Sequence, residues 1–205
     1  MRPLKGKTMR HASIVILAAV TLFIGGCATM SAQTPGAGLS PVNAIRDGGD
    51  EHVILFGHDV VSYFTEGTHR MGSPSIKSEY KSVTFRFSKP ENKALFDAAP
   101  EKYIPQFGAY CTNGIVYAIP AGGNPDTWKI IDGKLYIFGG QGALDGFMLD
   151  VPRNMALAHK YWTDEVNGSN PFVQRYKRWI FRVPHYVTGS ELAAQVAAAK
   201  AQGKL

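Results

Sequence analysis

The alternation of apolar and polar residues predicts strands in three parts of the chain. Residues 77–88 place three apolar side chains on one face, as in a half-buried strand: Val83, Phe85 and Phe87. Residues 128–138 carry an Asp-Gly pair between two apolar runs, which is typical of a β-hairpin turn. A shorter apolar strand is expected at the start of residues 52–64.

Four segments have the composition and boundaries of helices. Residues 89–98 follow Ser88, the expected N-cap, and a second short helix is expected from Pro100 through Tyr103, with Pro105 as its furthest end. Residues 152–165 and the Ala-rich residues 191–200 complete the set. Short strands interleaved with helices, without long βαβ spacing, predict an α+β fold. We expect a single domain in which a small antiparallel sheet with a hairpin packs against several short helices.

The N-terminus has the pattern of an export signal. Four basic residues and no acid precede an apolar run over residues 12–24. This run is shorter than the roughly 20 residues that span a bilayer, so it fits a secretory signal peptide over residues 1–26. Small residues then precede Cys27, as in a lipobox, which predicts that Cys27 is lipidated. The alternative is an ordinary signal peptide with a chance cysteine.

The net charge of the chain is smaller once the predicted signal peptide is left out. The whole chain has 22 basic and 16 acidic residues, a net charge of +6. Without the four basic residues of the signal, 18 basic residues face 16 acidic ones, so the net charge is +2. The basic balance is therefore partly an export feature, and nothing indicates a nucleic-acid partner. Residues 27–49 are small and polar, which predicts a flexible tether.

An ordered series of motifs resembles the YHS domain family, in its exported, stand-alone branch. The motifs are GHDVVSYF from Gly57, PEKY from Pro100, PQFGAYC from Pro105 and WKIIDGKLY from Trp128. The resemblance covers roughly residues 52–162, so we expect a YHS-like domain over residues 50–167 and a C-terminal extension over residues 168–205. Two positions depart from the family pattern: His58 replaces an aromatic residue and Ala109 replaces a glycine.

The resemblance implies metal binding, with copper the metal expected and zinc second. The many-cysteine ligand set of the transport-ATPase relatives is absent, and only Cys111 matches it. Cysteine and histidine ligands suit copper and zinc. We therefore take Cys111, His58 and Asp59 as the candidate metal ligands. The alternatives are a buried, inert Cys111, a hydrogen-bonded turn histidine at His58 and a turn or cap role for Asp59.

These observations predict a periplasm-facing lipoprotein, held by its lipid in the outer membrane if the host has two membranes. It would hold, sense or transfer a soft or borderline metal ion, and a metal-transport protein is the expected partner. One alternative is a non-catalytic interaction domain with an inert cysteine. A thiol enzyme would need a thiolate–imidazolium pair at Cys111, and no signature of a thiol hydrolase or peroxidase is present, so we expect binding rather than catalysis.

Residues 170–182 mix aromatic and aliphatic side chains with four cations. Such a segment suits an anionic membrane surface or a partner protein. The favoured interpretation is a helix or strand whose apolar groups pack on the core while its cations extend into water.

Overall fold

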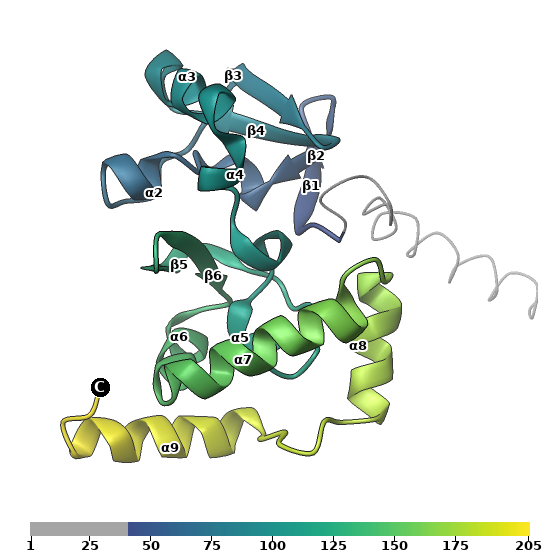
Figure 1. Cartoon of the computed structure of the whole chain (residues 1–205), viewed down its shortest axis with the longest axis vertical. Coiled ribbons are helices and arrows are strands. Elements are labelled where there is room, and N and C mark those ends of the chain that lie inside the picture. Colours follow the sequence, from purple (N-terminus) through teal and green to yellow (C-terminus); the bar gives the residue numbers. More distant parts are fainter. Residues whose placement is uncertain (1–40) are drawn as a thin grey trace, which may run out of the picture. The chain divides into compact units, whose positions relative to one another are not determined.

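Four strands pair in the order β1-β2-β4-β3 in the first of two sheets (Figure 1). The computed structural model describes residues 41–205, which belong to one compact unit. The strands are β1 (Ala44–Asp47), β2 (Asp50–Ile54), β3 (Ser73–Tyr80) and β4 (Val83–Phe87). The α+β class is confirmed, but the sheet is mixed, because β2 and β4 are parallel at Val53 and Thr84. The predicted signal peptide over residues 1–26 and the predicted lipidation site Cys27 lie outside the described residues.

The end of the expected tether is part of the fold. Strand β1 pairs with β2, and Val42 just before it is only 5 % exposed. The Asn43 backbone N–H donates to the Gly108 carbonyl at 2.7 Å, and the Tyr110 hydroxyl donates to the Val42 carbonyl at 3.2 Å. The prediction of a flexible tether up to residue 49 is therefore wrong for residues 41–49. Their backbone completes the edge of the sheet, and the side chains of Val42 and Ala44 add to the core.

Two helices follow β4 where the sequence predicted them, and the first of them packs on the first sheet. These are α3 (Pro90–Ala98) and α4 (Pro100–Tyr103), and both predictions are confirmed. Phe96 of α3 packs on Phe85 and Phe87, with ring centres 4.5 and 5.2 Å apart. The predicted cap is wrong, because the helix has Lys89 at its N-cap and the Ser88 hydroxyl donates elsewhere, to Asp59. Two short turns of helix, η1 (Leu55–Gly57) and α2 (Ser62–Thr65), precede β3.

The second sheet is the predicted hairpin of β5 (Asn124–Ile131) and β6 (Lys134–Phe138). Asp132 and Gly133 both have positive φ, of 49° and 72°, as a two-residue hairpin turn requires. Both faces of β6 are buried. Its alternate residues Leu135 and Ile137 join the core under the first sheet, whereas Tyr136 and Phe138 join a second core among the helices. The hairpin therefore links the two cores.

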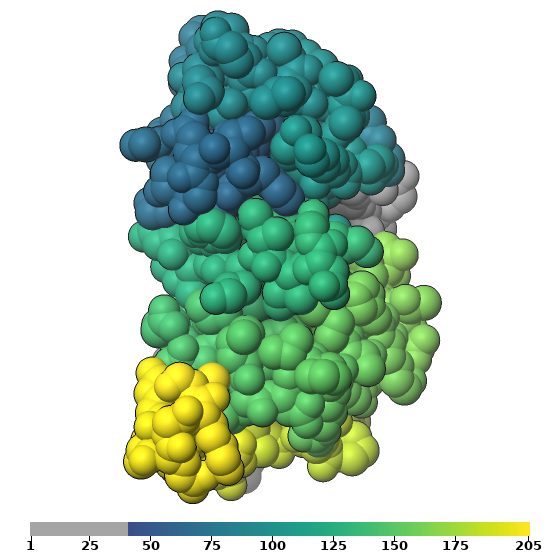
Figure 2. Space-filling model, turned by 60° about the vertical axis from the view of Figure 1, so that its left-hand side comes forward, coloured from purple at the N-terminus to yellow at the C-terminus, as the bar shows by residue number. Residues whose placement is uncertain are grey.

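The second core is enclosed by short helices on both sides of the hairpin in the sequence. They are η2 (Gln106–Ala109), α5 (Thr112–Ile115), α6 (Gln141–Met148), α7 (Val151–Tyr161) with a π-helical turn η3 (Trp162–Val166), α8 (Pro171–Ile180) and α9 (Gly189–Ala201). Helix α9, yellow in Figure 2, lies against the green part of the chain. It begins with a capping box between Thr188 and Glu191. No helix in the described part of the chain is long and apolar enough to cross a membrane.

Candidate functional site

Cys111 lies in the interior at the start of α5, and its side chain is 4 % exposed. The backbone N–H groups of Asn113, Gly114 and Gly139 are directed at its sulfur and favour the thiolate. Burial outweighs them and raises the pKa of the Cys111 thiol. Burial therefore favours the protonated thiol over the thiolate, and the thiolate is the form that attacks as a nucleophile and binds a metal ion.

Asp59 is fully buried, and both of its carboxylate oxygens are occupied. Oδ1 accepts the Val61 N–H at 2.9 Å and the Ser62 N–H at 3.3 Å, which closes the turn before α2. Oδ2 accepts the Ser88 N–H at 2.8 Å, the Ser88 hydroxyl at 2.6 Å and the Asn92 amide at 2.7 Å. A buried carboxylate that accepts five hydrogen bonds stabilises the local fold and has no oxygen lone pair directed at a ligand site. The geometry therefore favours the turn-and-cap alternative over a ligand role.

His58 lies in a different environment from Cys111, near the surface. Its Nδ1 is 3.1 Å from the Leu55 carbonyl oxygen. A carbonyl can only accept, so Nδ1 carries the proton and Nε2 keeps its lone pair. Burial of the ring, together with the nearby His69, lowers the pKa of His58, which favours the neutral imidazole. His58 is thus held in the tautomer that a metal ion needs.

Two residues that the sequence reasoning did not select face His58. The rings of His58 and His69 have centres 5.7 Å apart. Met71 is paired with His58 in an isolated antiparallel bridge, flanked by hydrogen bonds from Gly72 N–H to the Gly57 carbonyl and from Asp59 N–H to the Arg70 carbonyl. This is a non-hydrogen-bonded pair, in which facing side chains are closest. The spacing His69-x-Met71 in an extended segment was the signal available for placing both on one face.

Asp126 completes this cluster from the hairpin. Its Oδ1 is 3.3 Å from Nε2 of His69. A carboxylate on one ring nitrogen fixes the tautomer and leaves the other nitrogen, Nδ1, as the one with a lone pair. We refer to His58, His69 and Met71 as the two-histidine cluster, with Asp126 beside it.

The three ligands predicted from the sequence do not form a common site. Within residues 41–205, no group of three or more His, Cys, Asp and Glu side chains could hold a metal ion. The reason is topological: Cys111 faces Gly139 at the end of β6, whereas His58 faces the segment before β3. The two-histidine cluster is therefore a candidate only with the methionine sulfur of Met71 as a donor.

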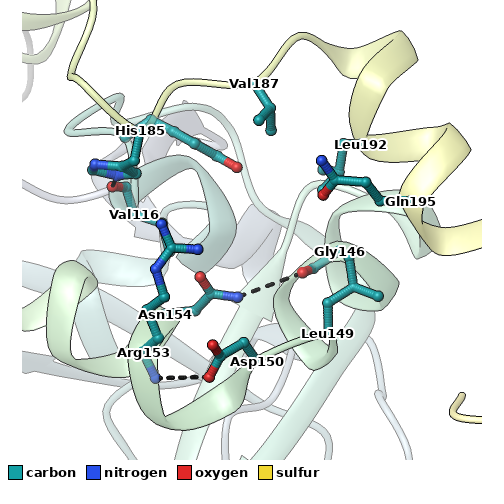
Figure 3. A pocket seen from close by; sticks show the side chains of 11 residues that line it. Val116, Gly146, Leu149, Asp150, Arg153, Asn154, His185, Val187, Leu192 and Gln195 are labelled. Atoms are coloured by element: carbon teal, nitrogen blue, oxygen red, sulfur yellow. Dashed lines mark hydrogen bonds between the residues drawn. The ribbon is translucent and has the colours of Figure 1, made fainter. Parts of the chain in front are cut away.

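A separate pocket of about 170 Å³ opens between α7 and the segment leading into α9 (Figure 3). His185 forms part of its wall, with Nε2 2.9 Å from the Val116 carbonyl and its ring stacked on Tyr117 at 5.6 Å. The Arg153 guanidinium also lines it, and its backbone N–H donates to Asp150 at 3.1 Å. The pocket has the size of one small polar molecule, and neither Cys111 nor the two-histidine cluster lines it.

Comparison with known proteins gives no match for this chain. No family model, no curated protein and no solved structure matches it. The resemblance to the YHS family therefore stays a prediction from the motifs.

Proposed function

We propose that this chain is a membrane-tethered, periplasm-facing copper-binding protein, and that its copper ligands are His58, His69 and Met71. The observation that supports the proposal most is the hydrogen bond from Nδ1 of His58 to the Leu55 carbonyl. Histidine ligands in proteins almost always donate their second ring N–H to a carbonyl or carboxylate, and this contact provides it. The proposal keeps His58 from the sequence prediction and replaces Cys111 and Asp59.

The distance between the two rings suits one shared ion. With metal–nitrogen bonds of about 2.0 Å, two imidazoles on one ion have ring centres roughly 5 to 6 Å apart. The observed separation is 5.7 Å, with the rings inclined by 60°. The ion would bind Nε2 of His58 and Nδ1 of His69, the two nitrogens left without a proton by Leu55 and Asp126.

The thioether of Met71 favours copper over zinc. Soft thioether sulfur selects Cu(I), whereas zinc sites use thiolate, imidazole and carboxylate. The Met71 side chain is 61 % exposed, and His69 has 40 % of its side chain exposed. An open site of this kind suits holding an ion and passing it to a partner protein, since the ion can leave without unfolding of the chain.

Metal titration of the chain from Ala28 onward tests the proposal, with Cu(I) under reducing conditions and Cu(II) and Zn(II) in parallel. We expect one copper ion per chain. His58→Ala and His69→Ala should each weaken binding by at least about tenfold, and Met71→Leu should weaken Cu(I) more than Zn(II). His159→Ala is the matched control, because His159 is an exposed histidine that packs on Phe107 instead.

Two results would contradict the proposal. One is tight copper binding that survives all three ligand substitutions. The other is copper binding that disappears in Cys111→Ser, which would show that the buried thiol of Cys111 is a copper ligand. If no metal binds at all, the interaction domain with an inert, buried Cys111 becomes the better account of the chain.

A further inference from the structure

Helix α8 is turned with its polar side toward the protein and its apolar side outward. Gln174, on the inner side, is 4 % exposed. Its side-chain amide donates to the Ala118 carbonyl and to Glu165, each at 3.1 Å. A buried amide with both contacts satisfied holds the helix in one rotation about its axis.

Glu165 of η3 fixes the same rotation through charge. Its carboxylate accepts hydrogen bonds from Arg178 and, at 2.9 Å, from Lys177. The Arg178 side chain is 13 % exposed and that of Glu165 is 16 % exposed, so this ion pair is largely shielded from water. Two cations of the helix are thus used to attach it to the protein, and the apolar positions are left on the other side.

The outward side of α8 carries a cluster of large apolar side chains, which we call the α8 apolar face. Its members and their exposed fractions are Phe172 45 %, Val173 60 %, Tyr176 56 %, Trp179 70 %, Ile180 51 % and Phe181 66 %. They are six of the eleven large apolar residues that are exposed within the described part of the chain. The expectation that this segment packs its apolar groups on the core is therefore wrong. Exposed clusters of this kind mark sites of interaction with a membrane or a partner.

The charge around the α8 apolar face is positive. Residues 170–182 contain four cations and no acid. Two of them form no direct ion pair within residues 41–205: Arg175 donates to the Pro171 carbonyl at 3.2 Å, and Arg182 lies over the Tyr186 ring at 4.3 Å. Figure 1 shows α8 at the edge of the described unit, beside α7.

We propose that the α8 apolar face docks on an anionic lipid surface. Helices that lie in the membrane interface combine Trp, Phe and aliphatic groups with Lys and Arg, and bind in proportion to apolar area and to attraction for anionic lipid. A second copy of the chain is a poorer occupant, because two basic faces would repel each other. This inference is independent of the copper site. It assigns the C-terminal extension a role in holding the domain against the membrane.

Vesicle co-sedimentation of the chain from Ala28 onward, which lacks the lipid attachment, tests this docking. Vesicles of phosphatidylcholine alone are compared with vesicles containing about 30 % phosphatidylglycerol. We expect binding to the anionic vesicles, a blue shift of tryptophan emission that the Trp179→Ala/Phe181→Ala double variant lacks, and at least about a tenfold loss of binding in that variant. The Arg175→Ala/Arg182→Ala variant should bind anionic vesicles about fivefold more weakly. Added salt should weaken the binding of the unaltered chain to the same vesicles.

Leu95→Ala is the matched control, because Leu95 is 43 % exposed on α3 and lies outside the α8 apolar face. It should bind as the unaltered chain does, and circular dichroism should show that all variants stay folded. Absence of vesicle binding at low salt would overturn the proposal, as would binding that the double variant retains. Equal binding to neutral and anionic vesicles would overturn the claim that anionic lipid attracts the α8 apolar face. Self-association that the double variant abolishes, without vesicle binding, would assign the face to a second copy.

Discussion

One carboxylate oxygen of Asp59 accepts both the backbone N–H and the hydroxyl of Ser88, at 2.8 and 2.6 Å, across 29 residues of sequence. The contact joins the turn before α2 to the end of β4 and the start of α3. Because Asn92 donates to the same oxygen, the carboxylate holds three segments in register. The opening GHDVVSYF motif is therefore a structural junction at Asp59, next to the candidate ligand His58.

Removal of this carboxylate should destabilise the fold. Asp59→Ala leaves the buried donors of Val61, Ser88 and Asn92 without an acceptor, and each unsatisfied buried group costs about 1–3 kcal/mol. We expect the free energy of unfolding in urea to fall by about 3 kcal/mol or more. Asp59→Asn should also lower the free energy of unfolding, because the NH₂ group of the asparagine side chain would face N–H and O–H donors in place of a carboxylate oxygen. Asp164→Ala, which removes an exposed pair with Lys160, should cost at most about 1 kcal/mol.

Gly108 tests whether residues 41–43 are part of the fold. It has φ +59°, and a Cβ there would collide with the Pro41 carbonyl and lie 3.2 Å from Cα of Val42. Gly67 has φ +64° with open space around it. Gly67→Ala should therefore cost about 1 kcal/mol from backbone strain alone, and Gly108→Ala about 1–3 kcal/mol more. Equal losses in urea unfolding would mean that residues 41–43 do not pack as described.

The sequence patterns predicted the elements whose evidence is local. The Asp132-Gly133 hairpin follows from turn chemistry, and the buried face of β4 follows from the alternation of Val83, Phe85 and Phe87. The parallel pairing of β2 with β4 could not be predicted in this way, because an apolar pattern identifies a buried face and not the neighbouring strand. The tether prediction for residues 27–49 fails at β1 for a different reason: small, polar composition does not exclude a strand that pairs at the edge of a sheet.

Helix α8 and the two-histidine cluster also depend on contacts between distant segments, which local sequence patterns do not predict. The composition of residues 170–182 predicted a helix or strand with its apolar groups on the core, but the contacts of Gln174 and Glu165 turn the polar side of α8 toward the protein. His58 was selected from its turn, whereas His69 and Met71 reach it only through a bridge between segments. Cys111 was selected for its chemistry, and its burial became known only from the fold.

Cys111 should react slowly with alkylating reagents. Its thiol is 4 % exposed and burial raises its pKa, so both access and thiolate fraction are reduced in the folded chain. In the chain from Ala28 onward, which contains no other cysteine, we expect iodoacetamide labelling at neutral pH at least about a hundredfold slower than in urea. Rapid labelling of the folded protein would instead indicate an accessible thiolate and revive the enzyme alternative.

Acid should weaken both the fold and copper binding through His58. Burial lowers its pKa below the usual 6.5, with His69 acting in the same direction and Asp126 and the Leu55 carbonyl opposing. The unfolded chain therefore takes up a proton on this residue at higher pH than the folded chain does. The contribution of His58 to stability is complete above pH 6.5 and is lost as the pH falls toward the folded pKa.

The ring protons of His58, followed by NMR, should titrate with a midpoint below 6.5, and copper should protect them from titration. A neutral imidazole is required for binding, so copper should be retained to lower pH than at a site with an unperturbed histidine. His58→Gln should reduce the loss of unfolding free energy between about pH 7.5 and about pH 5. A midpoint at or above 6.5 would show that the ring is solvated, and the fixed neutral tautomer that supports the copper site would then be absent.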